Sequence, residues 1–317
     1  MGRPGAADMR IAVIGSGGVG GYFGGRLAAA GHDVTFVARG RHLAALRDRG
    51  LTIESGTGNA HVTGAAFTDD VAAIGPCDAV MFCVKLWDVE TAARQVAPLV
   101  TKGGVVIPFQ NGVDAPEILT RTVGAASVLG GIAYIAATIR EPGVIAHTGT
   151  MARLVVGPFE GGNAAAAESF RDACVGAGVQ CDVSPDVRCA LWEKFCMLAA
   201  MAGCTSVARQ PAGVVRGDPD LRAAFEGAVR EAWTVGRARG VPLADDYVSR
   251  QLAFLDGLPA EMRSSMQNDL AAGNRLEAPW LSGAVVRMAR ESGLAAPVSA
   301  TLYAAVKPYV DGRSQKG

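Results

Sequence analysis

The chain has 317 residues, of which 50% are hydrophobic, and its 30 basic and 30 acidic residues give a formal net charge of zero. This length allows two domains. The balanced charge gives no net positive charge of the kind that attracts nucleic acid or an anionic membrane. No run approaches the ~18–20 apolar residues that a membrane span needs. The seven cysteines lack metal-site spacing, so we expect reduced, buried thiols, no metal and a cytoplasmic protein.

The first eight residues, MGRPGAAD, are polar and are expected to be a short disordered or vector-derived lead. From residue 9 to about 185, short apolar runs alternate with helix-length segments, which predicts a parallel sheet buried on both faces. The runs expected to be strands are RIAVIG, DVTFVAR, AVMFCVK, GGVVIPF, ASVLGGIAYIAA, ARLVVG and VQCDVS. The polar-tipped segment at 51–64, LTIESGTGNAHVTG, predicts an inserted hairpin or pair of strands.

From about Asp186 onward the strand signals stop and helical periodicity begins. The segment at 218–240, DPDLRAAFEGAVREAWTVGRARG, opens on an aspartate cap and closes on a glycine stop. We therefore predict an α/β fold class. A parallel-sheet domain over 9–185 precedes an all-helical domain over 186–312, and the cleft between them is the expected ligand site.

A glycine motif follows the first expected strand. Its residues are Gly15, Ser16, Gly17, Gly18, Val19 and Gly20. In such a motif the first glycine permits a tight turn, the second lets backbone approach a pyrophosphate, and the third packs the helix onto the strand. The motif opens a strand–helix–strand unit of about thirty residues, the context that favours dinucleotide binding over a plain glycine-rich turn.

The second strand is expected to end near Ala38, where an NAD-specific site would carry an acid for the ribose 2′-hydroxyl. Arg39 and Arg41 follow instead, and a guanidinium suits a 2′-phosphate. We therefore expect NADP rather than NAD or FAD, bound by a Rossmann-type domain over 9–185. The helical domain over 186–312 is then expected to serve substrate binding or dimerisation. The alternative is that Arg39 only caps a surface turn.

The segment at 191–203, LWEKFCMLAAMAG, is apolar almost throughout but carries Glu193 and Lys194. A lysine beside so much apolar surface costs free energy unless something pairs with it or uses it. The two charged residues are adjacent and so point in different directions on a helix, which argues against an ion pair. The alternative is a lysine that keeps its ammonium in solvent.

Four further segments, taken with the glycine motif, resemble the ketopantoate reductase (2-dehydropantoate 2-reductase) family. They are CVKLWD, PFQNGVD, LWEKF and SSMQNDLAAGNRLEAPWLSG, and the likeness runs from Met9 to about Tyr309. The resemblance implies a Rossmann domain followed by a helical domain, similar to 6-phosphogluconate dehydrogenase-like enzymes. It also implies reduction of a small-molecule 2-oxo acid by NADPH, and a homodimer.

The resemblance implies a role for each matching residue. Lys194 and Glu277 would be catalytic, with Lys194 as the general acid and Glu277 holding the cofactor end or a substrate hydroxyl. Lys85 and Asn111 would position cofactor and substrate, and Ser265 would contact the substrate carboxylate. Two alternatives stay open, because Asn111 also suits a turn and Glu277 also suits a solvated helix start.

A lysine general acid suits the reduction of a carbonyl group. Hydride transfer to a carbonyl creates an alkoxide, which needs a donor aimed at it. A lysine in the first turn of a helix can donate that proton, and apolar surroundings move its pKa towards the operating pH.

The chain departs from the family at substrate-binding positions. Leu198 and Ala202 stand where the family has carboxamides one and two turns after the lysine, and Met262 replaces an asparagine three residues before Ser265. Each lost hydrogen bond removes about 1–3 kcal/mol of discrimination. We therefore expect a more apolar substrate, with ketopantoate itself still open. The alternative function is an NADP-binding sensor or scaffold without turnover.

Overall fold

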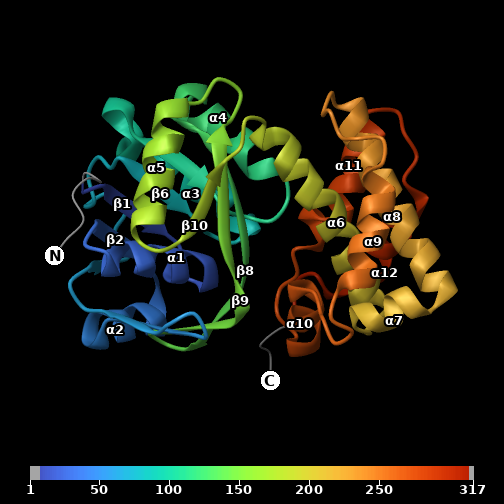
Figure 1. Ribbon diagram of the computed structural model, residues 1–317, viewed down its shortest axis with the longest axis horizontal. Helices are drawn as coiled ribbons and strands as arrows, with labels where there is room; N and C mark the ends of the chain where they lie inside the picture. The colour runs from blue at the N-terminus through green and yellow to red at the C-terminus, as the bar shows by residue number, and fades with distance from the viewer. Residues whose placement is uncertain (1–7, 314–317) are drawn as a thin grey trace. The chain divides into compact units, whose positions relative to one another are not determined.

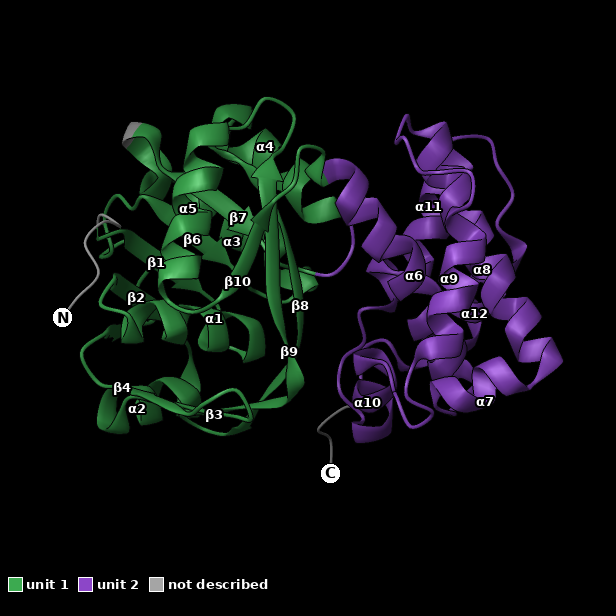
Figure 2. Ribbon diagram, viewed as in Figure 1, with its two compact units in different colours: residues 1–110, 114–187 green, residues 111–113, 188–317 purple. Residues whose placement is uncertain are grey.

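The computed structural model describes residues 8–313, so the expected lead lies outside the described residues except for Asp8. The chain divides into two compact units, 1–110 with 114–187, and 111–113 with 188–317 (Figure 2). The first unit carries every strand and the second is helical in its described part (Figure 1). Among residues 8–313, no helix is long and apolar enough to cross a membrane.

The first unit contains a five-stranded parallel sheet in the order β5-β2-β1-β6-β7. Its strands are β1 (Arg10–Ile14), β2 (Asp33–Val37), β5 (Ala66–Thr68), β6 (Ala79–Phe82) and β7 (Val105–Pro108). Ile11 to Ile14 are at most 2% exposed, which explains the unbroken apolar run of β1: both faces of the sheet are covered. The predicted parallel sheet is confirmed for these strands.

A second, mixed sheet has the order β10-β9-β3-β4, with β8 also paired to β9. Its strands are β3 (Leu51–Ser55), β4 (Ala60–Val62), β8 (Leu129–Glu141), β9 (Val144–Pro158) and β10 (Gln180–Val183). The hairpin predicted at 51–64 is confirmed, because β3 and β4 pair antiparallel. The runs ASVLGGIAYIAA and ARLVVG differ from the prediction: they lie in β8 and β9, a long antiparallel pair. The first half of β8 is buried on both faces, so its sequence is a continuous apolar run, which is also typical of a strand in a parallel sheet.

Helix α1 lies between the two sheets of the first unit, and its glycines explain how it fits. A Cβ on Gly24 would lie 2.6 Å from the side chain of Val13 in the parallel sheet. A Cβ on Gly25 would lie 2.6 Å from the side chain of Ile53 in the mixed sheet. Consecutive glycines therefore face opposite sheets. The helices of this unit are α1 (Gly18–Ala29), α2 (Gly40–Arg49), α3 (Val89–Val96), α4 (Asp114–Val123) and α5 (Ala164–Gly176).

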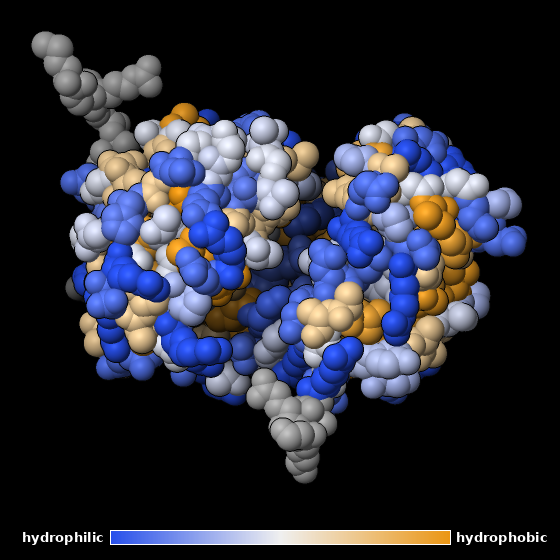
Figure 3. All heavy atoms as spheres, turned by 90° about the horizontal axis from the view of Figure 1, so that it is seen from below, coloured by the Kyte–Doolittle hydropathy of each residue, from blue (hydrophilic) through white to orange (hydrophobic). Residues whose placement is uncertain are grey.

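The second unit is a bundle of helices in its described residues. They are α6 (Val187–Ala208), α7 (Ala212–Gly217), α8 (Pro219–Ala238), α9 (Tyr247–Gly257), α10 (Ser265–Ala272), α11 (Ser282–Glu291) and α12 (Pro297–Val306). The predicted cap of α8 is confirmed, because the Asp218 side chain accepts hydrogen bonds from the backbone of Asp220 and Leu221. Polar residues cover much of the visible surface, and a group of apolar residues lies at the right of the view, on this unit (Figure 3).

Candidate active site

The glycine motif forms the turn between β1 and α1 in the first unit. Gly15 has a φ of 99°, and a Cβ there would lie 2.8 Å from the carbonyl oxygen of Cys83. A Cβ on Gly20 would collide with the Gly15 carbonyl, so the helix packs tightly onto the turn. Gly17 is different: a Cβ there would meet nothing within 4 Å. The middle glycine thus faces open space at the N-terminus of α1, where backbone N–H groups and the helix dipole suit a phosphate.

The other motif residues fix this turn. Val19 packs against the apolar core of the unit, and a Cβ on Gly18 would collide with the carbonyl of Ala137. The buried hydroxyl of Ser16 donates to the carbonyl of Val37 at 2.9 Å, which joins the turn to the end of β2. These contacts hold the backbone in one conformation and leave its ligand-facing side open, so the motif fits a dinucleotide.

His42 also contacts the turn, and no sequence motif points to it. Its Nδ1 accepts from the backbone N–H of Gly143 at 3.1 Å. Its Nε2 therefore carries the proton and donates to the carbonyl of Ser16 at 2.9 Å. Burial lowers the pKa of His42, which favours this neutral form. A neutral imidazole thus links the glycine turn to the β8–β9 turn.

The end of β2 places Arg39 where the sequence predicts it. The strand ends at Val37, Ala38 is buried, and Arg39 is exposed at the residue before α2. Its side chain makes no capping hydrogen bond to the helix. The position that an NAD-specific site would fill with an acid is therefore an alanine followed by an exposed guanidinium.

The loops after β6 and β7 carry the next two predicted residues. Lys85 is exposed, and its Nζ lies 5.6 Å from the ring centroid of Trp87. Gln110 donates through Nε2 to the carbonyls of Phe82 and Val84, both at 3.0 Å, and so anchors the chain just before Asn111. Asn111 itself clusters with the second unit.

Lys194 lies in the interior of α6, not in the first turn as expected, because the helix already begins at Val187. Its half-buried Nζ donates to Oδ1 of Asn111 at 3.1 Å. Burial lowers the pKa of Lys194 to about 8, and the carboxylate of Glu277 acts in the opposite direction and raises it. The structure thus gives the Lys194 ammonium a hydrogen bond to Asn111 and a favourable charge interaction with Glu277. The side chain of Glu193 pairs instead with Arg250 at 3.5 Å.

Glu277 is half-buried at the residue before a short 3-10 turn, Ala278–Trp280. Its backbone carbonyl accepts from Trp280, as expected for a helix start, but its carboxylate acts on Lys194. The alternatives are therefore not exclusive: Glu277 begins a turn and also contributes charge to the lysine.

Ser265 and Met262 lie at the start of α10. The side chain of Ser264, not Ser265, caps this helix and accepts from the backbone N–H of Gln267 at 3.1 Å. Ser265 is exposed in the first helical position, and Met262 is 45% exposed. The sequence did not distinguish the roles of the two serines, because either one could precede the apolar run.

Leu198 and Ala202 follow Lys194 at intervals of four on α6. Leu198 is half-buried and Ala202 is 1% exposed. This side of the helix is apolar beyond the lysine, as the sequence predicts. Among residues 8–313, no three His, Cys, Asp or Glu side chains gather as they would to hold a metal ion.

Two family models cover most of the chain. The model for ketopantoate reductase PanE/ApbA matches residues 11–161, and the model for its C-terminal domain matches residues 186–310. The chain belongs to the ketopantoate reductase family. This reductase is 33% identical over 297 residues to the 2-dehydropantoate 2-reductase of Halobacterium salinarum, a match that covers 93% of this chain and 96% of that protein. It is 31% identical over 304 residues to the uncharacterized oxidoreductase YkpB of Bacillus subtilis, and this match covers 95% of this chain and 99% of that protein.

Solved structures agree with the fold. The PanE/ApbA family ketopantoate reductase from Ralstonia eutropha JMP134 matches with a TM-score of 0.86 and 31% identity, over 95% of this chain and 98% of that one. The fold is shared with D-mandelate dehydrogenase, solved in a ternary structure with NADH and anilino(oxo)acetate. That match has a TM-score of 0.86 and 19% identity, and it covers 95% of this chain and 98% of that one. The predicted family and fold class are confirmed, and the reductase is an NAD(P)-dependent oxidoreductase that acts on CH–OH groups.

Proposed function

We propose that this reductase uses NADPH to convert a 2-oxo acid to a 2-hydroxy acid, with Lys194 as the general acid. The observation that carries the proposal is the half-buried Lys194, whose ammonium donates to Asn111 and whose pKa is raised by the carboxylate of Glu277. A lysine with a pKa of about 8 is still mostly protonated at neutral pH, yet gives up its proton far more readily than an exposed lysine.

Each residue of this group has a distinct part in the proposed reaction. When bound, the dihydronicotinamide supplies the hydride to the carbonyl carbon. Lys194 hydrogen-bonds the carbonyl oxygen and then transfers a proton from Nζ to the alkoxide that forms. Asn111 accepts one N–H of the ammonium, which orients the remaining donors, and the charge of Glu277 keeps the amine protonated until the oxygen needs the proton.

We propose NADPH rather than NADH because the exposed guanidinium of Arg39 follows β2 where an acid would select NAD. The glycine turn, with its open side at Gly17, would hold the pyrophosphate. Lys85 and Asn111 are proposed to position cofactor and substrate.

The proposed substrate is more apolar than ketopantoate. Leu198, Ala202 and Met262 supply no hydrogen-bonding side chain where the family has amides. Ser265 has an exposed hydroxyl at the start of α10 and is the proposed contact for the substrate carboxylate. A 2-oxo acid with a branched or aromatic side chain suits this combination of a carboxylate-binding end and an apolar end.

The seven cysteines, all of them in the described part of the chain, form no disulfide, which supports the proposed cytoplasmic location. A homodimer remains a prediction. It is supported by exposed large apolar side chains on the second unit, among them Val214 and Phe254.

A substrate panel tests the proposal. Purified protein is mixed with NADPH and a series of 2-oxo acids from ketopantoate to bulkier aliphatic and aromatic ones, and absorbance at the nicotinamide band is followed. Turnover that is more efficient on the apolar acids is expected. Ordinary efficiency on ketopantoate with none on bulkier acids would overturn the substrate proposal, and tight NADPH binding without any turnover would favour a sensor.

A further inference from the structure

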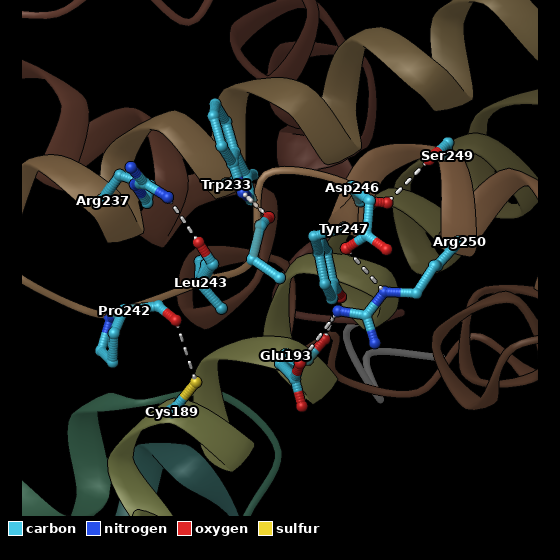
Figure 4. Close-up of polar contacts among 11 residues, drawn as sticks. Cys189, Glu193, Trp233, Arg237, Pro242, Leu243, Asp246, Tyr247, Ser249 and Arg250 are labelled. Atoms are coloured by element: carbon cyan, nitrogen blue, oxygen red, sulfur yellow. Dashed lines mark hydrogen bonds and ion pairs between the residues drawn. The ribbon is translucent and has the colours of Figure 1, made fainter.

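The turn of α6 that carries Lys194 is held by the segment between α8 and α9, here called the α8–α9 connection and comprising residues 239–246. Arg188 donates to the carbonyl of Arg239 at 3.0 Å, and Cys189 Sγ lies 3.8 Å from the carbonyl of Pro242. The third contact along α6 comes from Tyr247, the first residue of α9 (Figure 4). The helix is thus fixed along successive turns up to the residue before Lys194.

Tyr247 makes the contact nearest to the lysine. Its side chain is 1% exposed, and its hydroxyl donates to the backbone carbonyl of Glu193. The backbone of Met197, one turn further along α6, lowers the pKa of the same hydroxyl, although burial has the larger effect and raises it. In a regular helix, the carbonyl of residue 193 would pair with the N–H of residue 197. A carbonyl oxygen has two lone pairs, so it can accept from the Tyr247 hydroxyl in addition to this helical partner.

The carbonyl that Tyr247 holds belongs to the peptide unit joining Glu193 to Lys194. A peptide unit is planar, so fixing the direction of its carbonyl also fixes the N–H and Cα of the following residue. The orientation of this plane decides where the lysine side chain leaves the helix. Tyr247 is therefore connected to the ammonium through one rigid group rather than through loose packing.

The surroundings keep Tyr247 in place and its hydroxyl protonated. Arg250 lies over the ring, with its guanidinium carbon 5.8 Å from the centroid, and pairs with Asp246 at 3.1 Å (Figure 4). Burial raises the pKa of the Tyr247 hydroxyl. The hydroxyl therefore keeps its proton, and with it the donor towards Glu193, to higher pH than an exposed tyrosine would.

We propose that Tyr247 is a positioning residue for the reaction: its hydroxyl sets the Glu193–Lys194 peptide unit and thereby aims the Lys194 ammonium at the substrate oxygen. This inference rests on the proposed role of Lys194. It assigns to α9, which carries none of the family motifs recognised in the sequence, a part in proton transfer. A displacement of about 1 Å in a catalytic group can cost about 100-fold in rate, so loss of one hydroxyl has a measurable effect.

The test compares Tyr247→Phe with Trp233→Phe. Trp233 is the matched control, because its Nε1 donates to the carbonyl of Ala244 at 2.9 Å in the same connection but does not reach α6. Each change removes one aromatic donor to a backbone carbonyl. We expect Tyr247→Phe to lower kcat per folded enzyme by about 10- to 100-fold with the Kd for NADPH unchanged, and Trp233→Phe to leave kcat within about twofold of the wild type.

Two results would overturn the proposal: a Tyr247→Phe enzyme with kcat within twofold of the wild type, or equal losses in the two variants. A purely structural role would lower Tm in Tyr247→Phe without this change in kcat. If the variant does not fold, or if the wild type has no turnover, the wild-type hydroxyl proton of Tyr247 decides by NMR. Slow exchange of this proton supports the proposal, and rapid exchange with water contradicts it.

Discussion

The Nζ of Lys194 donates a hydrogen bond to Oδ1 of Asn111, 3.1 Å away, although 83 positions separate the two residues in the chain. The contact joins the loop after β7 to the middle of α6 and explains how a lysine is tolerated in an apolar helix. An amide oxygen accepts from the ammonium without neutralising it, so the group keeps its charge and its proton. This pair is the centre of the proposed chemistry.

The pH dependence of reduction should report Lys194. With a pKa of about 8, the ammonium loses its proton as pH rises through 8, so kcat should fall on the alkaline side of that value. In Glu277→Gln the carboxylate that raises the pKa is absent, and the alkaline limb should move to lower pH. Steady-state rates between pH 6 and pH 10 measure both curves. A Glu277→Gln limb that stays in place or moves to higher pH would contradict the pairing.

The buried ammonium should also lower stability near neutral pH. The folded pKa of about 8 lies below the unfolded value of about 10.4, so the unfolded chain binds the proton more tightly. The penalty is full below pH 8 and disappears as pH rises through 10.4. Lys194→Met should therefore raise the free energy of unfolding by about 2–3 kcal/mol at pH 7 and by much less at pH 10.5.

Urea unfolding at the two pH values measures this difference, with Lys307→Met as the control at an exposed position. A Lys194→Met protein that is less stable than the wild type at pH 7 would show that the lysine stabilises the fold, which is the opposite of the expected effect.

Cofactor preference should depend on Arg39. Loss of a charge-assisted bond to a phosphate costs about 1.5–3 kcal/mol, so Arg39→Ala should weaken NADPH binding by about 10- to 100-fold. Binding of NADH, which lacks the 2′-phosphate, should change little. Fluorescence titration with both nucleotides gives the two Kd values, and equal losses would rule out the assignment of Arg39 to the 2′-phosphate.

Substrate preference should respond to α6. Leu198→Asn restores an amide one turn after Lys194, and we expect the ratio of kcat/KM for ketopantoate over an apolar 2-oxo acid to rise about tenfold. Val207→Asn is the control, because it makes a similar change at an exposed position of the same helix. An unchanged ratio in Leu198→Asn, or the same shift in Val207→Asn, would contradict the proposed role of Leu198 in substrate preference.

Several of these features can be predicted from the sequence alone. Gly15 and Gly20 indicate the dinucleotide turn because a side chain at either position would collide with backbone, and the cap at Asp218 marks the start of α8. The antiparallel pairing of β8 with β9 cannot be predicted in this way, because a strand buried on both faces has the same apolar run in either kind of sheet.

Long-range contacts also leave no trace in the sequence. His42 and Tyr247 act through hydrogen bonds to backbone groups, which include the carbonyls of Ser16 and Glu193. Any carbonyl can accept such a bond, so neither partner leaves a pattern in the sequence. Only the folded chain shows which peptide unit each side chain reaches.

The most direct test of the account is the rate of hydride transfer in a single turnover of Lys194→Ala with saturating NADPH and the preferred 2-oxo acid. General acid catalysis contributes about 10²–10⁴-fold, so the rate should fall by that factor while the Kd for NADPH stays at the wild-type value. A Lys194→Ala enzyme that transfers hydride within threefold of the wild-type rate would contradict the role of Lys194 as proton donor.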